Sequence, residues 1–553
     1  MTESPLNAVI RFESNGFDMT GPVLMGRQAA GYGFLRAALA AEREGPLHGY
    51  GPNPQAGEAL AALAARLDPA AQTAWISIDQ VERFNAFGVC YRPDAALAME
   101  ARLRLRAGVA RHCLCGVTHT LSSGRMMEAI AELVTAPLMP WDAVICTSQA
   151  ARGVMETILD EQEAYTTWRF QAPAPERPQL PIIPLGIHTR DFDHTADDRA
   201  RARAALELDE TSVVVLYAGR LTFSDKAHPF AMLAAMQAAA TQTGKTVILV
   251  LAGRFANDFG GRAYRAAVQT FCPDVRCIFV DGARFDAYRD AWSAADLFVS
   301  AADSFQETFG LTPLEAMAAG LPCVVSDWNG YRDTVRDGID GFRVPTWAPA
   351  EGSGEALGRR LEAETLGDDF FAWRYTAAVA VDLKALTERL AQLIDNPDLR
   401  RAMGAAGRER ARGEFEWTDV YRRYQALWGE LNARRLAVAE DAGLVARAAA
   451  APRASAGKLD PFRTFGHYPT RSVTVETVVA ASPDASMARY RQLTTHPIFN
   501  GVFETPAHGL ALMEALPSGD TNVGALARAA RLPPAAAIVG VATLAKLGLV
   551  RLG

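Results

Sequence analysis

The sequence has no long hydrophobic run and no surplus of positive charge. It contains no stretch of about 18 consecutive apolar residues, the length that a membrane-spanning helix requires. Its first residues, "MTESPLNAVIRFESNG", lack a basic start followed by an apolar core, so we expect no signal peptide. The formal net charge is −7, which disfavours general binding to nucleic acid. We therefore expect a cytoplasmic protein with no nucleic-acid partner.

Cysteine is also scarce. The seven cysteines are scattered, mostly in apolar settings such as "LPCVVS" and "VICTS", and Cys113 and Cys115 lack further ligands at the spacing of a zinc site. We expect reduced, buried thiols rather than disulfides or a metal centre. In contrast, 49% of the residues are apolar and 22% are charged, which is typical of a globular protein with large cores.

With 553 residues the chain is too long for a single domain. From residue 211, short and nearly continuous apolar runs alternate with helical stretches, which is typical of a parallel sheet covered on both faces. The pattern predicts a doubly wound α/β domain, which binds ligands outside the carboxyl ends of its strands. The expected strands are 212–220, 246–254, 275–282, 295–302 and 321–328, and the expected helices between them are 228–244, 261–272, 285–295 and 311–320.

The first 190 residues repeat this pattern less regularly, with expected strands at 8–12, 73–78, 115–120, 142–148 and 180–186. We predict an N-terminal Rossmann-like domain over 1–195 and a second one over 196–432. Residues 433–494 are expected to be a linker, because they are rich in Ala with Pro, Ser and Gly. Residues 495–553 are expected to form a small, mainly helical module, in which "TNVGALARAARLPPAAAIVGVATLAKLGLV" indicates a helix, a turn and a second helix.

The segment "SFQETFGLTPLEAMAAGLPCVVSDW", residues 304–328, contains two glutamates eight positions apart. Thr312, Pro313 and Glu315 fit a capping box that opens a helix, and Glu307 in the preceding loop fits a solvated carboxylate. Both glutamates nevertheless follow a predicted strand and flank a helix N-terminus, which favours anions. Carboxylates beside an anion site are suited to accept hydrogen bonds from hydroxyl groups. A nucleotide sugar offers both a diphosphate and hydroxyls.

Two cations follow the first strand of the same domain. "YAGRLTFSDKAHP" contains Arg220 at the strand's carboxyl end and Lys226 six residues later. Surface ion pairs are the ordinary role of such residues, but two cations at a strand end of this sheet also fit a clamp for a diphosphate. The sequence therefore predicts a site for a nucleotide sugar at this edge.

These residues resemble those of a retaining glycosyltransferase of family 4, which has the GT-B fold of two Rossmann-like domains facing a cleft. "ETFGLTPLE" matches the family's Glu-x7-Glu signature, "AGRLTFSDKAHP" resembles its Gly-Arg-Leu…Lys segment, and "GVTHTLSS" resembles its N-domain histidine strand. "VICTSQAARGVME" resembles the strand and helix that follow, "IPLGIHTRDF" the segment that enters the second domain, and "FEWTDVYRRYQALW" the helix that crosses back to the first. The resemblance covers residues 8–432.

The resemblance implies roles for the matching residues. Arg220 and Lys226 would hold the diphosphate, Glu307 would accept hydrogen bonds from the donor sugar, and Glu315 would accept from the ribose. His119 would approach the donor sugar from the first domain, although a satisfied core histidine is its alternative role. The further substrate contacts implied are the backbone near Phe309, Gly310, Leu311 and Thr312, and the glycines Gly21 and Gly26 of the loop "GPVLMGRQAAG", which would permit close approach to the phosphates and acceptor.

The resemblance also implies transfer with retention of configuration, in which the cations and the helix N-terminus stabilise the leaving diphosphate. We expect no cofactor and no metal, because the Asp-x-Asp pair Asp191 and Asp193 lies in the predicted interdomain linker rather than after a strand. Two alternatives stay open from the residues. One is a sugar-nucleotide epimerase or a phosphorylase on the same fold, and the other is a non-catalytic nucleotide-sugar sensor.

The expected acceptor is a glycan, a lipid-linked sugar or a small molecule, in a process such as polysaccharide biosynthesis. "MEARLRLRAGVARH" spreads Arg102, Arg104, Arg106 and Arg111 around a helix, which favours a solvated helix over a membrane-binding face, although peripheral membrane contact stays open. The second helix of the C-terminal module is too apolar to contact DNA. We expect this module to pack on the catalytic body, to dimerise or to bind a protein partner.

Overall fold

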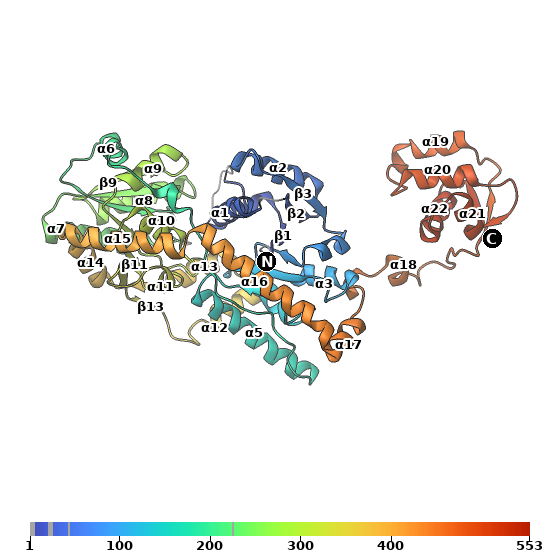
Figure 1. Ribbon diagram of the computed structural model, residues 1–553, viewed down its shortest axis with the longest axis horizontal. Helices are drawn as coiled ribbons and strands as arrows, with labels where there is room; N and C mark the ends of the chain where they lie inside the picture. The colour runs from blue at the N-terminus through green and yellow to red at the C-terminus, as the bar shows by residue number, and fades with distance from the viewer. Residues whose placement is uncertain (1–5, 20–25, 43–44, 224–225) are drawn as a thin grey trace, which may run out of the picture. The chain divides into compact units, whose positions relative to one another are not determined.

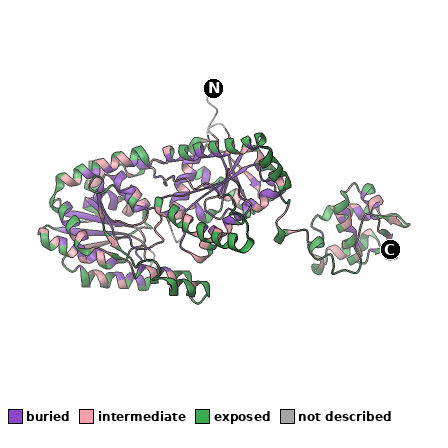
Figure 2. Ribbon diagram, turned by 90° about the horizontal axis from the view of Figure 1, so that it is seen from below, coloured by how far each residue is buried: buried purple, intermediate pink, exposed green. Residues whose placement is uncertain are grey.

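The computed structural model describes residues 6–19, 26–42, 45–223 and 226–553. It separates into two compact units, Met1–Ser455 and Ala456–Gly553 (Figure 1). The first unit contains two six-stranded parallel sheets. One large hydrophobic cluster includes residues of both sheets, and each sheet also has a cluster of its own. The buried residues concentrate in the strands of these sheets (Figure 2).

The first sheet confirms the expected N-terminal Rossmann-like domain. Its strand order is β3-β2-β1-β4-β5-β6, and all neighbouring strands are parallel. The strands are β1 (Val9–Arg11), β2 (Leu47–Gly51), β3 (Thr73–Ser77), β4 (Val89–Tyr91), β5 (Cys113–Val117) and β6 (Ala143–Ile145). The helices of this domain are α1 (Gly26–Ala41), α2 (Pro54–Leu67), α3 (Ala98–Ala107), α4 (Gly124–Ala131) and α5 (Gln149–Phe170).

The second sheet has the same topology, because its order, β12-β11-β10-β7-β8-β9, repeats that of the first when read from the other edge. Its strands are β7 (Val213–Ala218), β8 (Val247–Gly253), β9 (Arg276–Asp281), β10 (Leu297–Ser300), β11 (Cys323–Ser326) and β12 (Gly341–Val344). Its helices are α6 (Ala196–Ala205), α7 (Pro229–Thr243), α8 (Asp258–Phe271), α9 (Phe285–Ala294), α10 (Leu311–Ala319) and α11 (Tyr331–Thr334). The chain order reverses between β7 and β10, and ligands of such sheets bind outside the carboxyl ends of the strands at that reversal.

All five strands expected in the second domain are present, whereas the strand expected at 180–186 is not. That segment makes only isolated bridges, Ala143 with Gln179 and Cys146 with Ile182. Pro181 and Pro184 lack the N–H groups that a ladder needs, so the segment runs along the sheet edge without joining it.

Helices after the second sheet return the chain to the first domain. They are α14 (Leu383–Asp395), α15 (Pro397–Glu414), α16 (Trp417–Ala437) and α17 (Ala442–Ala450). On α16, the amide of Gln425 donates to the Asn7 side chain at 2.8 Å, and Tyr421 packs its ring 5.5 Å from that of Phe34 on α1. The helix expected to cross back is therefore confirmed.

One expectation about the first domain is wrong. Arg104 on α3 was expected to lie in solvent with its neighbouring arginines, but its side chain is fully buried. It forms a two-pronged ion pair with the equally buried Asp142, at 2.6 and 2.7 Å, and donates to the carbonyls of His112 and Pro137. A guanidinium can be buried only when its charge and donors are matched in this way. Arg104 is thus a structural residue of the core.

The second unit, 456–553, is larger than the module expected at 495–553. Its central strand, β15 (Val478–Ala481), pairs antiparallel with β16 (Thr521–Asn522) and β17 (Val550–Leu552), so residues assigned to the linker complete its sheet. The helices are α18 (Pro461–Thr464), α19 (Met487–Thr494), α20 (Pro506–Ala515), α21 (Val523–Ala529) and α22 (Pro534–Lys546). The expected helix–turn–helix is confirmed as α21 and α22, and Pro534 opens the second helix.

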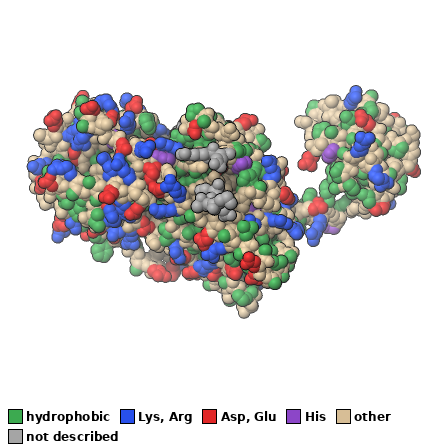
Figure 3. All heavy atoms as spheres, in the orientation of Figure 1, with side chains coloured by type: hydrophobic (Ala, Val, Ile, Leu, Met, Phe, Trp, Pro, Cys, Tyr) green, Lys and Arg blue, Asp and Glu red, His purple; other side chains and the backbone are tan. Residues whose placement is uncertain are grey.

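All seven cysteines are free, and six of them are buried, as expected. Among the described residues no single helix is long and apolar enough to cross a membrane, and only the bent pair α21 and α22 passes a test of length and composition. Acidic and basic side chains are interspersed over the face shown in Figure 3.

Candidate functional site

The candidate site lies where the order of the second sheet reverses. Arg220 follows the end of β7, and the loop that carries Glu307 follows the end of the neighbouring strand, β10. Gly219 between β7 and Arg220 has a φ of +142°, a value that a residue with a side chain rarely adopts. The hydroxyl of Tyr217 donates to the carbonyl of Arg220 at 3.0 Å and stabilises this turn. The sheet therefore brings together the two segments that the sequence singled out.

Lys226 and Glu307 form an ion pair across this reversal. Their side chains are only 17% and 11% exposed. Burial is the largest single effect and lowers the pKa of Lys226, but the charge of Glu307, the charge of Tyr331 and the hydrogen bond with Glu307 together outweigh it, so the pKa of the ammonium is raised. The positive charge of Arg220 lowers the pKa of the same ammonium, so the two cations are close enough to interact electrostatically. Two cations and one carboxylate thus meet at the ligand edge of the sheet.

The glutamate loop also contacts the first domain. The hydroxyl of Thr308 donates to the carbonyl of His119 at 2.8 Å, and the hydroxyl of Ser148 donates to the carbonyl of Thr308 at 2.7 Å. Both first-domain residues follow the carboxyl ends of strands, His119 after β5 and Ser148 after β6. The residue next to Glu307 is therefore bonded to the backbone of His119.

Helix α10 begins differently from the expected capping box. The N-cap is Gly310 rather than Thr312, and no side chain caps the helix, so Glu315 is the fifth residue of the helix instead of the expected third. Gly310 has a φ of +96°, and a Cβ there would lie 2.3 Å from the ring of Tyr331. Only glycine fits, which fixes the helix start at Leu311. Pro313 is tolerated because the first N–H groups of a helix have no partner within it.

Glu315 is left without the capping bond and is partly buried. Burial raises the pKa of its carboxyl to about 7, and the charge of Lys226 opposes that shift. A carboxyl with this pKa exists in both protonation states near neutral pH. It can therefore donate as well as accept a hydrogen bond, which suits a contact with a ligand hydroxyl.

His119 is partly buried, and its surroundings keep it neutral. Burial and the positive charge of Arg27 lower the pKa of its imidazole to about 4, and Asp94 opposes the shift only weakly. A neutral imidazole has one donor and one acceptor nitrogen, so His119 is equipped for hydrogen bonding rather than for supplying charge.

The other residues named from the sequence fall in different places. Phe309 has its side chain buried in the core, and only its backbone lies at the loop. Gly26 is exposed at the first residue of α1, and a Cβ there would meet nothing within 4 Å. Gly21 lies outside the described residues. Leu311 and Thr312 are the first two residues of α10, at its partial positive end.

Sequence reasoning missed Asp303, which lies at the end of β10 with 5% of its surface exposed. Its carboxylate accepts the backbone N–H of His228 at 3.2 Å, and burial raises its pKa to about 7. An aspartate directly after an apolar strand at the ligand edge could have indicated a site residue, but only the two glutamates that follow it were selected. Tyr331 was also missed, and its hydroxyl bonds that of Ser300 at 2.9 Å.

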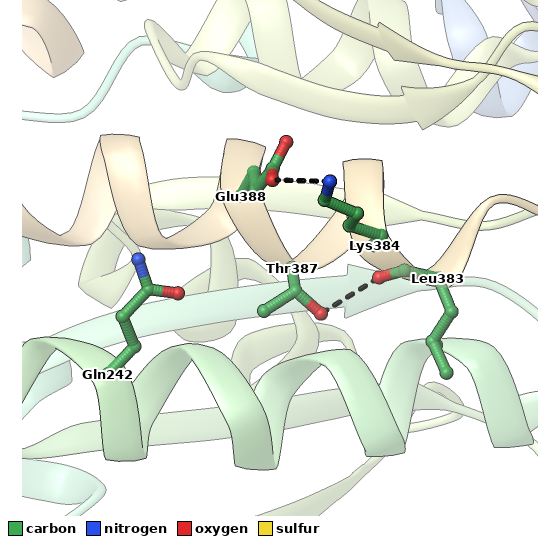
Figure 4. A pocket seen from close by; sticks show the side chains of 5 residues that line it. All are labelled: Gln242, Leu383, Lys384, Thr387 and Glu388. Atoms are coloured by element: carbon green, nitrogen blue, oxygen red, sulfur yellow. Dashed lines mark hydrogen bonds and ion pairs between the residues drawn. The ribbon is translucent and has the colours of Figure 1, made fainter.

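Asp191 and Asp193, weighed above as metal ligands, form ion pairs with Arg36 and Arg412 respectively. Within the part of the chain that the structure describes, no group of three His, Cys, Asp or Glu residues is arranged to hold a metal ion. An open surface pocket of about 470 Å³ lies between α7 and α14, and its lining residues are Gln242, Leu383, Lys384, Thr387 and Glu388 (Figure 4). None of the candidate residues lines this pocket, so we do not assign the ligand to it.

Comparison with known proteins agrees with the geometry. Residues 212–362, which contain Arg220, Lys226, Glu307 and Glu315, match the family model for glycosyl transferases group 1. The chain is 26% identical over 307 residues to D-inositol 3-phosphate glycosyltransferase of Segniliparus rotundus, covering 55% of this chain and 57% of that protein. It is 24% identical over 311 residues to a GDP-mannose-dependent monoacylated alpha-(1-6)-phosphatidylinositol monomannoside mannosyltransferase of Corynebacterium glutamicum, covering 54% and 70%. The match thus spans little more than half the length of the first of these relatives.

Solved structures show the fold. HepE of Anabaena in complex with UDP superposes with a TM-score of 0.52 at 13% identity, covering 77% of this chain and all of that one. A glycosyltransferase from Rickettsia africae superposes with a TM-score of 0.51 at 12% identity, covering 77% and 98%. The fold of the first unit is GT-B, as the resemblance implied.

Proposed function

We propose that the protein is a glycosyltransferase that moves a hexosyl group from a nucleoside diphosphate sugar to an acceptor hydroxyl. The observation that carries this proposal is the Lys226–Glu307 ion pair beside Arg220, at the strand reversal of a domain that matches glycosyl transferases group 1. The solved structures of HepE with UDP and with UDP and glucose support a donor of this class. A nucleotide-binding regulator or an epimerase would need the donor site but not a position for an acceptor.

Each residue has a role in this proposal. Arg220 and Lys226 bind the diphosphate, together with the N-terminus of α10. Glu307 then exchanges part of its contact with Lys226 for hydroxyls of the donor sugar. Glu315 accepts from, or donates to, the ribose, and neutral His119 bonds the donor sugar from the first domain.

The chemistry follows from the charge that develops on the leaving group. As the bond between the sugar's C1 and the β-phosphate oxygen breaks, the electron pair moves to the diphosphate, and the fixed cations stabilise that charge more than they stabilise the ground state. The acceptor oxygen bonds to C1 on the same face, and its proton passes to the departing phosphate oxygen. The configuration at C1 is then retained.

A metal ion is not needed for this step, because Arg220, Lys226 and the helix dipole supply positive charge where a divalent cation otherwise would. The acceptor is a hydroxylated molecule. The names of the relatives, an inositol phosphate glycosyltransferase and a phosphatidylinositol mannoside mannosyltransferase, direct the first assays to polyol and glycolipid acceptors.

The proposal is tested by incubating the purified chain with UDP-glucose, GDP-mannose and ADP-glucose and measuring the release of free nucleotide. We expect slow release with one donor class, faster release when an acceptor is added, and loss of both in Glu307→Ala. A product whose anomeric configuration differs from that of the donor would contradict retention. Tight donor binding without nucleotide release under any acceptor would instead identify a regulator.

A further inference from the structure

An excursion of the chain leaves the second domain at its ligand edge and returns to the same point. It spans residues 346–382 and consists of β13 (Thr346–Trp347), α12 (Glu355–Glu362), α13 (Asp368–Thr376) and β14 (Ala380–Val381). The two short strands pair antiparallel and close the excursion at its base. Because β12 runs parallel to β11 and ends at Val344, two residues before this base, the excursion starts from the same edge as the glutamate loop. Labels α12 and α13 lie near the middle of the first unit in Figure 1.

Aromatic side chains join the excursion to the glutamate loop. The ring of Tyr375 on α13 stacks on that of Phe305, with centroids 4.6 Å apart and an interplanar angle of 26°. Phe371, one turn earlier on the same helix, lies 5.7 Å from Phe305. Phe305 belongs to the turn in which the N–H of Glu307 donates to the carbonyl of Ser304 at 3.2 Å. The excursion therefore packs directly on the turn that positions Glu307.

The same excursion reaches the first domain. A carboxylate oxygen of Asp368, the first residue of α13, accepts the backbone N–H of Gly124 at 2.8 Å. Gly124 opens α4, five positions after His119. One side of the excursion thus contacts the turn of Glu307, and the other contacts the segment that follows His119. These are the two residues assigned to the donor sugar above.

Tyr375 has the features of a side chain that binds a sugar. Its ring is partly exposed beside the stacked Phe305, and its hydroxyl makes no hydrogen bond with any residue that the structure describes. An aromatic face packs well on the apolar C–H face of a hexose, and a phenolic hydroxyl can bond the sugar's hydroxyls. Two other aromatic residues of α13 differ, because the guanidinium of Arg374 lies over the rings of Phe370 and Trp373, at 4.9 and 5.0 Å, on an exposed part of the helix.

We propose that residues 346–382 form the side wall of the sugar end of the donor site, and that Tyr375, supported by Phe305, binds the hexosyl group. This inference rests on the proposed function and names a specificity element that lies mostly beyond residues 212–362, the region that matches the family. The wall acts on the sugar and not on the nucleotide, since Arg220 and Lys226 hold the diphosphate.

The test compares the Kd of each nucleoside diphosphate with the Kd of the corresponding nucleotide sugar. The ligands are UDP, GDP and ADP, together with UDP-glucose, GDP-mannose and ADP-glucose. Calorimetry gives the Kd of each for the full chain and for the variants Tyr375→Ala, Tyr375→Phe and Trp373→Ala. For the nucleotide that binds, we expect Tyr375→Ala to weaken binding of the hexose donor by about fivefold, the effect of one aromatic contact, while the Kd of the bare nucleotide is unchanged. Tyr375→Phe keeps the ring and should keep most of the affinity.

The matched control is Trp373→Ala, which removes a large aromatic side chain from the same helix without touching Phe305 and should change neither Kd. An unchanged Kd for the hexose donor in Tyr375→Ala would overturn the inference, and so would a parallel loss for donor and bare nucleotide, which would indicate a distorted turn. Failure of the wild-type chain to bind any of the six ligands would refute the proposed function itself, a separate outcome.

Discussion

Replacing Lys226 with methionine separates the two roles of the Lys226–Glu307 ion pair. Methionine keeps much of the length and the apolar stem of lysine but removes the charge. In the free protein the change leaves the carboxylate of Glu307 without its counter-charge at a position that is 11% exposed. In the donor complex it removes one of the two cations assigned to the diphosphate.

The magnitudes of these effects differ. Removing one partner of a buried ion pair costs about 3–5 kcal/mol of stability, and the partial exposure of both side chains makes this an upper bound here. Losing one fixed contact to a developing negative charge costs about 2.7–4 kcal/mol in the barrier, which is roughly a 100- to 1000-fold loss in kcat. A loss of this size in turnover, with a folded protein, would identify Lys226 as part of the diphosphate clamp.

The assay measures nucleotide release from the preferred donor alongside chemical denaturation. The double variant Lys226→Met/Glu307→Gln is the control, because it removes both charges and leaves no isolated carboxylate. We expect the double variant to recover most of the stability but none of the activity. Full turnover in Lys226→Met would refute the clamp, and recovered turnover in the double variant would show that the single variant failed only through misfolding.

Three further predictions follow from the same structure. A bound diphosphate should favour the neutral form of Glu315, whose pKa is raised to about 7, so donor binding takes up a proton. The Kd of the donor, measured by calorimetry, should therefore rise between about pH 6 and pH 8. Glu315→Gln should flatten this pH dependence, and an unchanged slope in the variant would contradict the assignment. Asp142→Ala should lower the free energy of unfolding in a denaturant titration by roughly 3–5 kcal/mol, because it strands the buried charge of Arg104. Asp398, which forms an exposed ion pair with Arg401, is the control, and Asp398→Ala should change the free energy of unfolding by less than about 1 kcal/mol. Nucleotide release should persist in excess EDTA, and its abolition would show that a divalent cation is required.

The long apolar strands of the second domain could be predicted from the sequence, because strands such as β7 and β8 are buried on both faces and read as continuous apolar runs. Strands without such a run could not. β2 reads "LHGYG" and β12 reads "GFRV", and neither has a run of apolar residues long enough to distinguish it from a loop. Their pairing comes from neighbouring strands, which a local pattern does not contain.

The roles of the candidate site residues stay predictions, whereas their local geometry can be compared with the structure. Lys226 and Glu307 form an ion pair because the sheet order places the ends of β7 and β10 side by side, and Arg220 follows β7 at the same edge. The capping box at Thr312 was mispredicted, since the contact of Gly310 with Tyr331 overrides a local capping signal.

Long-range contacts account for the other misses. The buried ion pair of Arg104 joins residues 38 positions apart, and the stack of Tyr375 on Phe305 joins two elements that the sequence gave no reason to connect.

The measurement that tests the central claim most directly is the thermal stability of the chain with and without UDP-, GDP- and ADP-sugars, in the wild type and in Arg220→Ala. A specific donor at about 100 times its Kd should raise the free energy of unfolding by about 2.7 kcal/mol. We expect one nucleotide class to stabilise the wild type in this way and Arg220→Ala to lose most of the effect. Stabilisation by none of the donors, or equal stabilisation of the variant, would contradict it.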